Sequence, residues 1–282
     1  MQESIRKADI LIEALPYIQA FRGKVIVAKY GGSAIDNPSA MRGILQDLIF
    51  LSVVGIAPIL VHGGGPMITR KLSAAGKGTA FIEGMRVTDL ATVKIVDQAL
   101  EEVNRRLVAQ IRELGGTAHG IVAKDQVILA EPHPQSSRLG YVGSIKTIKT
   151  QPIRELCVRQ IIPVISPVGM AEDQLYNINA DTVASEMAAS LKAEKLVLLT
   201  NVRGILRQAN DPNSLLSTVS VKETKVLLER RVIQEGMIPK VKACVEALRH
   251  GVKKAHIIDA AVPHAMLLEI FTKTGVGTEI VR

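Results

Sequence analysis

Two short apolar runs, each ended by glycines, constrain the fold of this chain more than any other feature. They are Val25–Ser33 (VIVAKYGGS) and Ile59–Pro66 (ILVHGGGP). Each predicts a strand, a tight turn and a helix start. Glycine lets a backbone approach a ligand, and a helix N-terminus offers free N–H groups to an anion. Either turn alone would be only a strand–helix connection. The pair, with Lys29 inside it, predicts a site that holds a phosphate chain.

The composition narrows the possible classes of function. The 282 residues are 47% hydrophobic with no Trp, so we expect an aliphatic core in one large α/β domain or two lobes. We find neither a spanning apolar run nor a signal-peptide core. Cys157 and Cys244 lack metal-ligand spacing, which favours a reduced, cytoplasmic setting. The charge of +8 is scattered and aromatic residues are few, which favours anionic small molecules over nucleic acid as partners.

The N-terminal residues Glu3–Ala20 carry apolar side chains at helical spacing, with Pro16 inside the pattern. Proline removes one N–H and clashes with the preceding turn, so we expect a kinked helix. Its apolar stripe predicts docking either on another subunit or on its own domain.

Helical and extended patterns alternate through most of the chain. Asn37 and Asp89 are predicted to cap helices, and Gly115 to end the second of these. Residues Thr117–Thr150 are predicted to form hairpins, which would make a small antiparallel insertion. The remaining segments are predicted as strands Ala57–Val61, Ile161–Ser166, Lys195–Thr200, Ala255–Asp259 and Thr278–Val281, helices Pro66–Gly76, Ala180–Ser190, Gly236–Leu248 and Pro263–Phe271, a polar connector Glu83–Asp89, an extended lead-in Gln174–Asn179 and a loop-rich stretch Val202–Ser220. This alternation favours a mostly parallel sheet sandwiched by helices, with ligands beyond the carboxyl ends of the strands.

Several nucleotide and hydrolase motifs are missing. The sequence has no G-x-x-x-x-G-K-[ST], no H-R-D or D-F-G, no G-x-S-x-G and no G-x-G-x-x-G. What remains is the two glycine turns with Lys29, Lys240 at a helix start and Asp181 near another. Phosphoryl transfer needs such a set of N–H groups and cations around the negative charge that is distributed over the oxygens of the transferring group.

The chain resembles the N-acetylglutamate kinases of the amino-acid-kinase family almost from end to end. The resemblance implies a three-layer αβα sandwich. The motifs that carry it are Lys29–Gly32 (KYGG), His62–Pro66 (HGGGP), Gly84–Asp89 (GMRVTD), Asn177–Asp181 (NINAD), Leu198–Gly204 (LLTNVRG) and Gly236–Lys240 (GMIPK).

The resemblance implies ATP-dependent phosphorylation of the side-chain carboxylate of N-acetyl-L-glutamate, the second step of arginine biosynthesis. Lys29 and Lys240 would neutralise the transferring group, and Asp181 would hold them in register. Mg²⁺ would arrive on ATP, without a dedicated metal cluster. The implied substrate contacts are Gly64, Gly65, Arg86, Asn177 and Asn179, and the implied nucleotide contacts are Lys29, Gly31, Gly32, Thr200, Asn201, Gly204 and Lys240.

The chain also resembles the arginine-sensitive branch of the family. It implies feedback inhibition by L-arginine, a hexamer built as a trimer of dimers, and a possible PII-type partner. Residues 1–22 would form the oligomerisation helix, 23–178 a lobe for N-acetylglutamate that carries the dimer helix, and 179–282 a lobe for ATP and arginine. The expected arginine contacts are Tyr17, Lys222, His256, Glu269 and Gly277.

The chain departs from the family pattern at a few positions. Met67 and Thr69 replace a common Glu and Asn, Ala123 replaces a glycine, and Glu235 stands where a second glycine is usual. Two alternatives stay open: an aminoadipate-type carboxylate kinase of the same fold, and a regulator that binds nucleotide or arginine without turnover.

Overall fold

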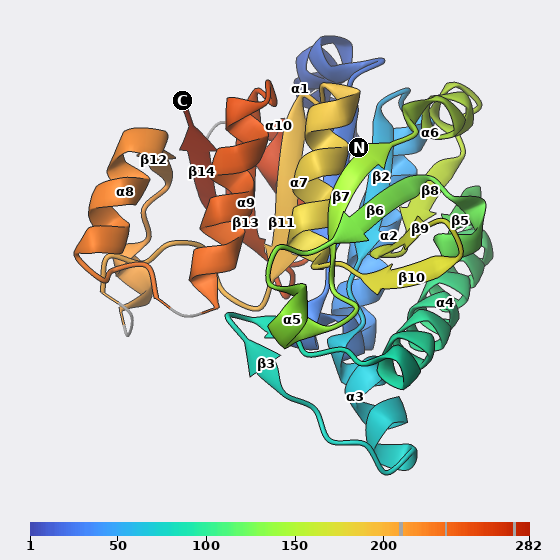
Figure 1. Ribbon diagram of the computed structural model, residues 1–282. Coiled ribbons are helices and arrows are strands. Elements are labelled where there is room, and N and C mark those ends of the chain that lie inside the picture. The colour runs from blue at the N-terminus through green and yellow to red at the C-terminus, as the bar shows by residue number, and fades with distance from the viewer. Residues whose placement is uncertain (209–210, 235, 273–274) are drawn as a thin grey trace.

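The structure is a computed structural model that describes residues 1–208, 211–234, 236–272 and 275–282, with only the backbone at Lys7, Ser33 and Ala34. Among these residues, eight strands form the central sheet in the order β12-β14-β13-β11-β1-β2-β8-β5 (Figure 1). All neighbours are parallel except β13 and β14. The strands are β1 (Val25–Tyr30), β2 (Ala57–His62), β5 (Ala118–Ile121), β8 (Ile162–Ile165), β11 (Lys195–Thr200), β12 (Thr218–Ser220), β13 (Lys254–Asp259) and β14 (Thr278–Val281).

Helices cover both faces of this sheet, which confirms the three-layer αβα sandwich. The helices α7 and α9 lie on one face and α2 and α10 behind it (Figure 1). The α-helices are α1 (Gln2–Phe21), α2 (Pro38–Val53), α3 (Gly65–Ala74), α4 (Leu90–Glu113), α5 (Ser136–Leu139), α6 (Thr150–Val158), α7 (Ala180–Leu191), α8 (Val221–Glu229), α9 (Met237–Arg249) and α10 (Ala265–Phe271). Short 3-10 turns are η1 (Gly32–Asp36), η2 (Ala123–Asp125) and η3 (Pro212–Ser214).

Strand β1 shows how the sheet separates two cores. Successive side chains of a strand point to opposite faces. Val27 packs with the residues of α7 and α9, whereas Ile26 and Ala28 pack with those of α2, α4 and α10. Lys29 is two residues from Val27 and therefore points to the face that α7 covers.

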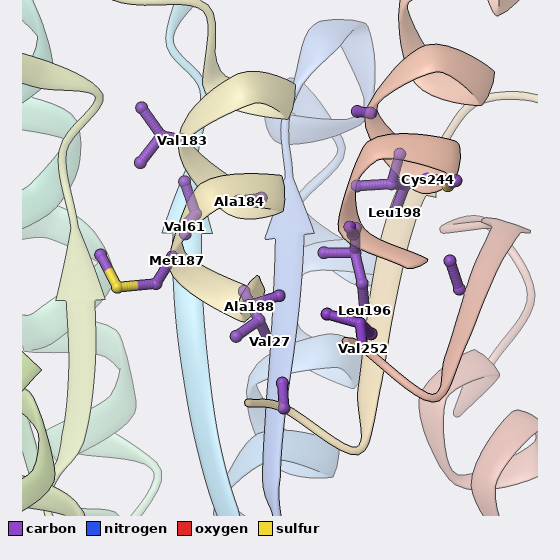
Figure 2. Close-up of a cluster of buried hydrophobic side chains, with 14 of the residues drawn as sticks. Val27, Val61, Val183, Ala184, Met187, Ala188, Leu196, Leu198, Cys244 and Val252 are labelled. Atoms are coloured by element: carbon purple, nitrogen blue, oxygen red, sulfur yellow. The ribbon is translucent and has the colours of Figure 1, made fainter. Parts of the chain in front are cut away.

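The core on that face is aliphatic, as expected. Figure 2 shows Val183, Ala184 and Met187 of α7 above β1 and β2, with Cys244 of α9 above β11. Ala184 and Ala188 are small, so the helix approaches the sheet closely. This packing fixes the N-terminal turn of α7, where Asp181 lies.

The insertion between the main strands is larger than the sequence indicates. A second sheet, with four strands in the described residues, has the order β10-β9-β6-β7. The predicted hairpin is present as β6 (Ile128–Pro132) against β7 (Gly143–Ile148). The prediction was wrong at Ala118–Ile121, which joins the central sheet as a parallel edge strand. The hairpin of β9 (Val168–Ala171) and β10 (Gln174–Asn177) was not predicted as such.

The polar connector at Glu83–Asp89 is more ordered than predicted. It contains the short pair β3 (Phe81–Ile82) and β4 (Met85–Arg86), which runs antiparallel. Within it, Arg86 and Thr88 are buried. The connector therefore carries interior groups although its sequence is polar.

The N-terminal helix α1 is present, with Pro16 inside it. Near its C-terminal end, Tyr17 packs edge-on against Phe271 of α10, with ring centroids 6.1 Å apart. Most of its apolar side chains remain exposed. Among the described residues, no helix combines the length and the hydropathy that crossing a bilayer would require.

Candidate active site

The two glycine turns lie against each other at the carboxyl ends of β1 and β2, as predicted. The Gly63 N–H donates to the Tyr30 carbonyl at 2.8 Å. A Cβ on Gly31 would stand 3.1 Å from the Gly63 Cα, so neither position has room for a side chain. Glycine is required here because backbone packs on backbone. Beside this contact, Gly32 and Gly65 face open space.

A buried carboxylate joins the two predicted catalytic lysines. Lys29 Nζ lies 2.9 Å from Asp181 Oδ1, and Lys240 Nζ lies 3.4 Å from Asp181 Oδ2. The three residues come from β1, α7 and α9, which are far apart in sequence. The structure thus brings Lys29, Asp181 and Lys240 together beside the glycine turns.

Burial and the two lysines act in opposite directions on Asp181. Burial raises the pKa of its carboxyl group, but the adjacent ammonium groups of Lys29 and Lys240 more than offset this and hold the pKa below its usual value. The carboxylate therefore stays ionised at neutral pH. An ionised Asp181 can hold two cations that would otherwise repel each other.

Arg86 lies buried under the turn that leads into α3. Its guanidinium donates to the hydroxyls of Thr69 and Thr79 and sits 4.7 Å from the Phe81 ring centroid. Thr69 is one of the departures from the family pattern, and here it accepts from Arg86 at 3.0 Å. Burial lowers the pKa of Arg86. The predicted Arg86 is thus next to Gly65, whose carbonyl also lies within 3.4 Å.

The two predicted asparagines have different surroundings. Asn177 Nδ2 donates to the Thr88 hydroxyl at 3.3 Å, and that hydroxyl donates to the Arg86 carbonyl. Asn179 caps α7, because its Oδ1 accepts from the Asp181 and Thr182 N–H groups. Asn177 therefore joins the Arg86 region, while Asn179 orients the helix turn that carries Asp181.

A cavity of about 1060 Å³ opens beside Asn179. It lies between the β3–β4 turn, α7, α8 and α9, and includes Gly236 and Pro239 just before Lys240. Glu235, the departure nearest to Lys240, lies outside the described residues.

The predicted nucleotide contacts follow β11. Thr200 ends the strand and is buried, and its hydroxyl donates to Asn201 Oδ1 at 3.3 Å. Gly204 has a φ of +140°, which a residue with a side chain rarely adopts, and a Cβ there would meet the Thr278 hydroxyl. These residues lie at the carboxyl end of a strand adjacent to β1, on the same edge as Lys29.

Three of the predicted arginine contacts lie together around β13 and α10. His256 Nδ1 is 2.7 Å from Glu269 Oε1, and the Val276 N–H donates to Glu269 Oε2 at 2.8 Å. Gly277 packs against the Ile257 carbonyl. Tyr17 reaches the same region through its contact with α10, whereas Lys222 is exposed at the start of α8.

Sequence reasoning missed a buried polar cluster beneath the second glycine turn. His62 Nε2 lies 3.0 Å from Ser166 Oγ and 3.2 Å from Asn104 Nδ2. His62 Nδ1 lies 2.8 Å from the Gly63 carbonyl. One signal was available: Asn104 interrupts the apolar stripe of α4, where it is buried among Leu100, Leu107 and their neighbours.

A mostly parallel α/β sandwich with glycine turns and two lysines on one buried carboxylate is the arrangement expected of an enzyme that transfers phosphoryl groups to small molecules. A model of the amino acid kinase family matches residues 24–259. The chain belongs to this family. Within it, the chain is 45% identical to an acetylglutamate kinase of Heliobacterium modesticaldum over the full length of both, and 46% identical to one of Syntrophomonas wolfei over 99% of this chain and 98% of that one. It therefore groups with the acetylglutamate kinases.

Solved structures share the fold of this chain. An N-acetylglutamate synthase from Neisseria gonorrhoeae, complexed with coenzyme A and N-acetyl-glutamate, is 28% identical with a TM-score of 0.86. The match covers 96% of this chain and 62% of that longer protein. The same synthase has been solved with coenzyme A and L-arginine, at a TM-score of 0.83, with 95% of this chain and 64% of that one covered. Carbamate kinase from Giardia lamblia, bound to AMP-PNP, is 15% identical with a TM-score of 0.68 over 92% of this chain and 99% of that one, and shows the fold alone.

Proposed function

We propose that this protein transfers the γ-phosphoryl group of ATP to the side-chain carboxylate of N-acetyl-L-glutamate, giving N-acetyl-L-glutamyl 5-phosphate and ADP. The observation that carries the proposal is the pairing of Lys29 and Lys240 on Asp181 beside two abutting glycine turns. The acceptor carboxylate is ionised at pH 7, so no general base is needed. Stabilisation of the spread charge on the phosphoryl group is then the main task of the site.

On the acceptor side, Arg86 is suited to the α-carboxylate, because a planar guanidinium makes two parallel hydrogen bonds. Its guanidinium donates to the hydroxyls of Thr69 and Thr79, which orient it beside Gly65. Gly64 and Gly65 would offer N–H groups at the start of α3, and Asn177 and Asn179 would bind the remaining polar groups of the substrate.

On the nucleotide side, Lys29, Gly31, Gly32 and Lys240 would contact the phosphates, and Thr200, Asn201 and Gly204 the rest of the nucleotide. Mg²⁺ would be bound mainly by ATP oxygens and would neutralise charge there. Both Asp181 oxygens are engaged by lysines, which is consistent with a metal held by the phosphates. In this division, residues 23–178 bind N-acetylglutamate and 179–282 bind ATP and arginine.

A substrate panel tests this proposal. ADP release and hydroxylamine trapping of the acyl phosphate would be measured with N-acetylglutamate, aminoadipate, N-acetylaminoadipate and carbamate at one ATP concentration. We expect the highest kcat/KM with N-acetylglutamate. A higher kcat/KM with an aminoadipate compound would show that N-acetylglutamate is not the substrate. Nucleotide binding without turnover of any compound would favour the alternative of a regulator that has no catalytic activity.

We also propose that L-arginine, the pathway end product, inhibits the enzyme. Glu269 is the main support: burial raises the pKa of its carboxyl group, but hydrogen bonding to His256 and Val276 more than offsets this, so it stays ionised and can pair with a guanidinium. Tyr17 and Gly277 flank it, and Lys222 and His256 would face the effector's carboxylate. The synthase structure solved with L-arginine supports the same idea by similarity.

The exposed apolar stripe of α1 supports a hexamer assembled as a trimer of dimers, with residues 1–22 joining the dimers. In this assembly the dimer helix belongs to residues 23–178. We place the enzyme in the cytoplasm, where its substrates are made, and a PII-type signalling protein is a further candidate partner.

A further inference from the structure

The buried cluster beneath the second glycine turn has no part in the chemistry proposed above. His62 ends β2, Asn104 lies on α4 and Ser166 follows β8, and all three are buried. A polar group in such a place costs free energy unless it is hydrogen-bonded. The neighbourhood is shaped for the cluster, because a Cβ on Gly120 would collide with Asn104 Oδ1.

The contacts fix the protonation state of His62. The Gly63 carbonyl, 2.8 Å from Nδ1, can only accept, so Nδ1 carries the hydrogen. Asn104 Nδ2 faces the Val164 carbonyl at 2.8 Å, which identifies it as the amide nitrogen, a donor. The same nitrogen lies 3.2 Å from Nε2, so Nε2 must accept. The ring is therefore neutral, with its hydrogen on Nδ1. Burial supports this, because it lowers the pKa of His62 to about 4.

The hydrogen bond to Gly63 has a consequence for the next N–H group. A trans peptide is planar, and its C=O and N–H point in opposite directions. With the Gly63 carbonyl turned toward His62, the Gly64 N–H points away from the buried cluster. Gly64 precedes α3, whose first residue, Gly65, faces open space.

We propose that His62 is a positioning residue whose Nδ1–H holds the Gly63 carbonyl and so aims the Gly64 N–H at the anion bound between the two glycine turns. Asn104 and Ser166 act through His62 by keeping the hydrogen on Nδ1. This inference rests on the proposed kinase reaction, in which that anion is the transferring phosphoryl group or the acceptor carboxylate. It assigns a function to a histidine that touches neither substrate.

Two conservative variants separate the roles of the two ring nitrogens. In His62→Asn the amide nitrogen takes roughly the place of Nδ1 and can still donate to Gly63. In His62→Gln the amide oxygen reaches the place of Nε2 and can accept from Asn104, but the donor to Gly63 is lost. We expect kcat within about threefold of wild type for His62→Asn. For His62→Gln we expect a loss of about tenfold to a hundredfold, the range for a misplaced site group, with the KM for ATP changed much less.

Ile111→Ala is the matched control, since Ile111 is buried on the same face of α4 as Asn104 and lies near the C-terminal end of that helix, beside Gly116. It should lower the melting temperature while kcat at 25 °C stays at the wild-type value. Equal losses of kcat in His62→Asn and His62→Gln would overturn the proposal, because a structural role needs no particular nitrogen.

A second measurement does not depend on activity. In protein labelled with ¹⁵N-histidine, the ring signal that disappears in His62→Asn is that of His62, and NMR should show this ring neutral with its hydrogen on Nδ1 throughout pH 6–8. A hydrogen on Nε2 of that ring would overturn the proposal. If the substrate panel shows no turnover of N-acetylglutamate, the proposed function fails, and this spectrum still decides whether His62 donates to Gly63.

Discussion

At the scale of single residues, the two lysines that meet at Asp181 are not equivalent. Lys29 is almost completely buried, so its removal also leaves a buried carboxylate short of a partner, which destabilises a fold. Lys240 is more exposed, so replacing it should affect catalysis with less effect on the stability of the fold. For Lys240→Ala we expect kcat to fall about a hundredfold or more, as for other single donors to transition-state charge, with little change in the KM for N-acetylglutamate.

Lys253→Ala, which replaces an exposed lysine just after the same helix and outside the cavity, is the control and should keep kcat within about twofold of wild type. Steady-state kinetics on both variants provides the measurement. If Lys240→Ala retained a third of the wild-type kcat, its ammonium group would have no substantial effect on the transition state.

The histidine beneath the glycine turn also predicts a pH dependence of stability. His62 has a pKa of about 4 in the fold, against an ordinary value of 6.5. Between these values the unfolded chain binds more protons than the native one, so stability falls as pH falls from 6.5 to 4, and this effect is complete below 4. The expected loss is roughly 3 kcal/mol.

Urea unfolding of wild type and His62→Asn from pH 7 to pH 4 measures this effect. Other titrating groups are common to both proteins, so the difference between the two curves reports His62. We expect the wild type to lose more stability than the variant over this range. Parallel curves would mean that the imidazole titrates in the fold as it does in the unfolded chain.

The sequence predicts the residues that act on the ligand better than those that orient them. Lys29, Asp181 and Lys240 stand out because each is a charged group beside glycine or a helix start, and the structure brings them together. His62, Asn104 and Ser166 do not, because each follows or interrupts an apolar run and only tertiary contact joins them. The hydrogen bonds of Arg86 to Thr69 and Thr79 were hidden for the same reason.

At the scale of elements, helix caps are the most predictable features. Asn37 was predicted as the cap of α2, and its Oδ1 accepts from the Ser39 and Ala40 N–H groups at 3.2 Å. We expect Asn37→Ala to destabilise the protein by about 1 kcal/mol. Asn37→Asp should be nearly neutral, since aspartate caps equally well.

Denaturant unfolding of the two Asn37 variants is the check. Equal stability of Asn37→Ala and wild type would show that water replaces the cap without loss. Any change should appear in the midpoint and not in the slope, because the surface exposed on unfolding is the same.

The pairing of strands with one another was harder to predict than the presence of the strands and helices themselves. The run at Ala118–Ile121 is short and apolar, and its own sequence does not show that it pairs with β8 in the central sheet. The β9–β10 hairpin turns at Glu172, whose φ of 51° is unusual for a residue with a side chain. Without Asn-Gly or Asp-Gly, the turn signal was absent. The helices α6 and α8 were missed, although Ser220 and Glu223 form a capping box at the start of α8.

At the scale of the whole molecule, one continuous sheet carries two groups of predicted contacts, one around β1 and the other around β13 and α10. The glycine turns and Lys29 lie at the carboxyl end of β1. His256 lies on β13, which is joined to β1 through β11. The contact of Tyr17 with Phe271 places α1 at the helix that carries Glu269. A ligand between α1 and α10 could thus act on the orientation of α1, and through α1 on any subunit that α1 touches.

The exposed apolar stripe of α1 predicts what happens to the assembly when α1 is removed. Ile5, Ile10, Leu11, Ile12 and Leu15 are 44–67% exposed in the isolated chain. Such a patch marks an interaction site, and in the proposed assembly its partner is a second dimer. A protein that starts at Gly23 should therefore form dimers by light scattering and keep its basal kcat, with arginine inhibition weakened or lost. A truncated protein that remained hexameric and fully inhibited would contradict this assignment.

Truncation also removes Tyr17, so a point variant is needed to separate assembly from arginine binding. Leu11→Glu places a charge in the stripe, costly to bury in an apolar contact, and leaves Tyr17, His256 and Glu269 intact. We expect this variant to form dimers that still bind arginine by calorimetry but are inhibited less. An effector shifts activity only by binding one geometry better than another, and in the proposed assembly the geometry that would differ is the one α1 imposes between dimers. Full inhibition in dimeric Leu11→Glu would place the whole response within one dimer.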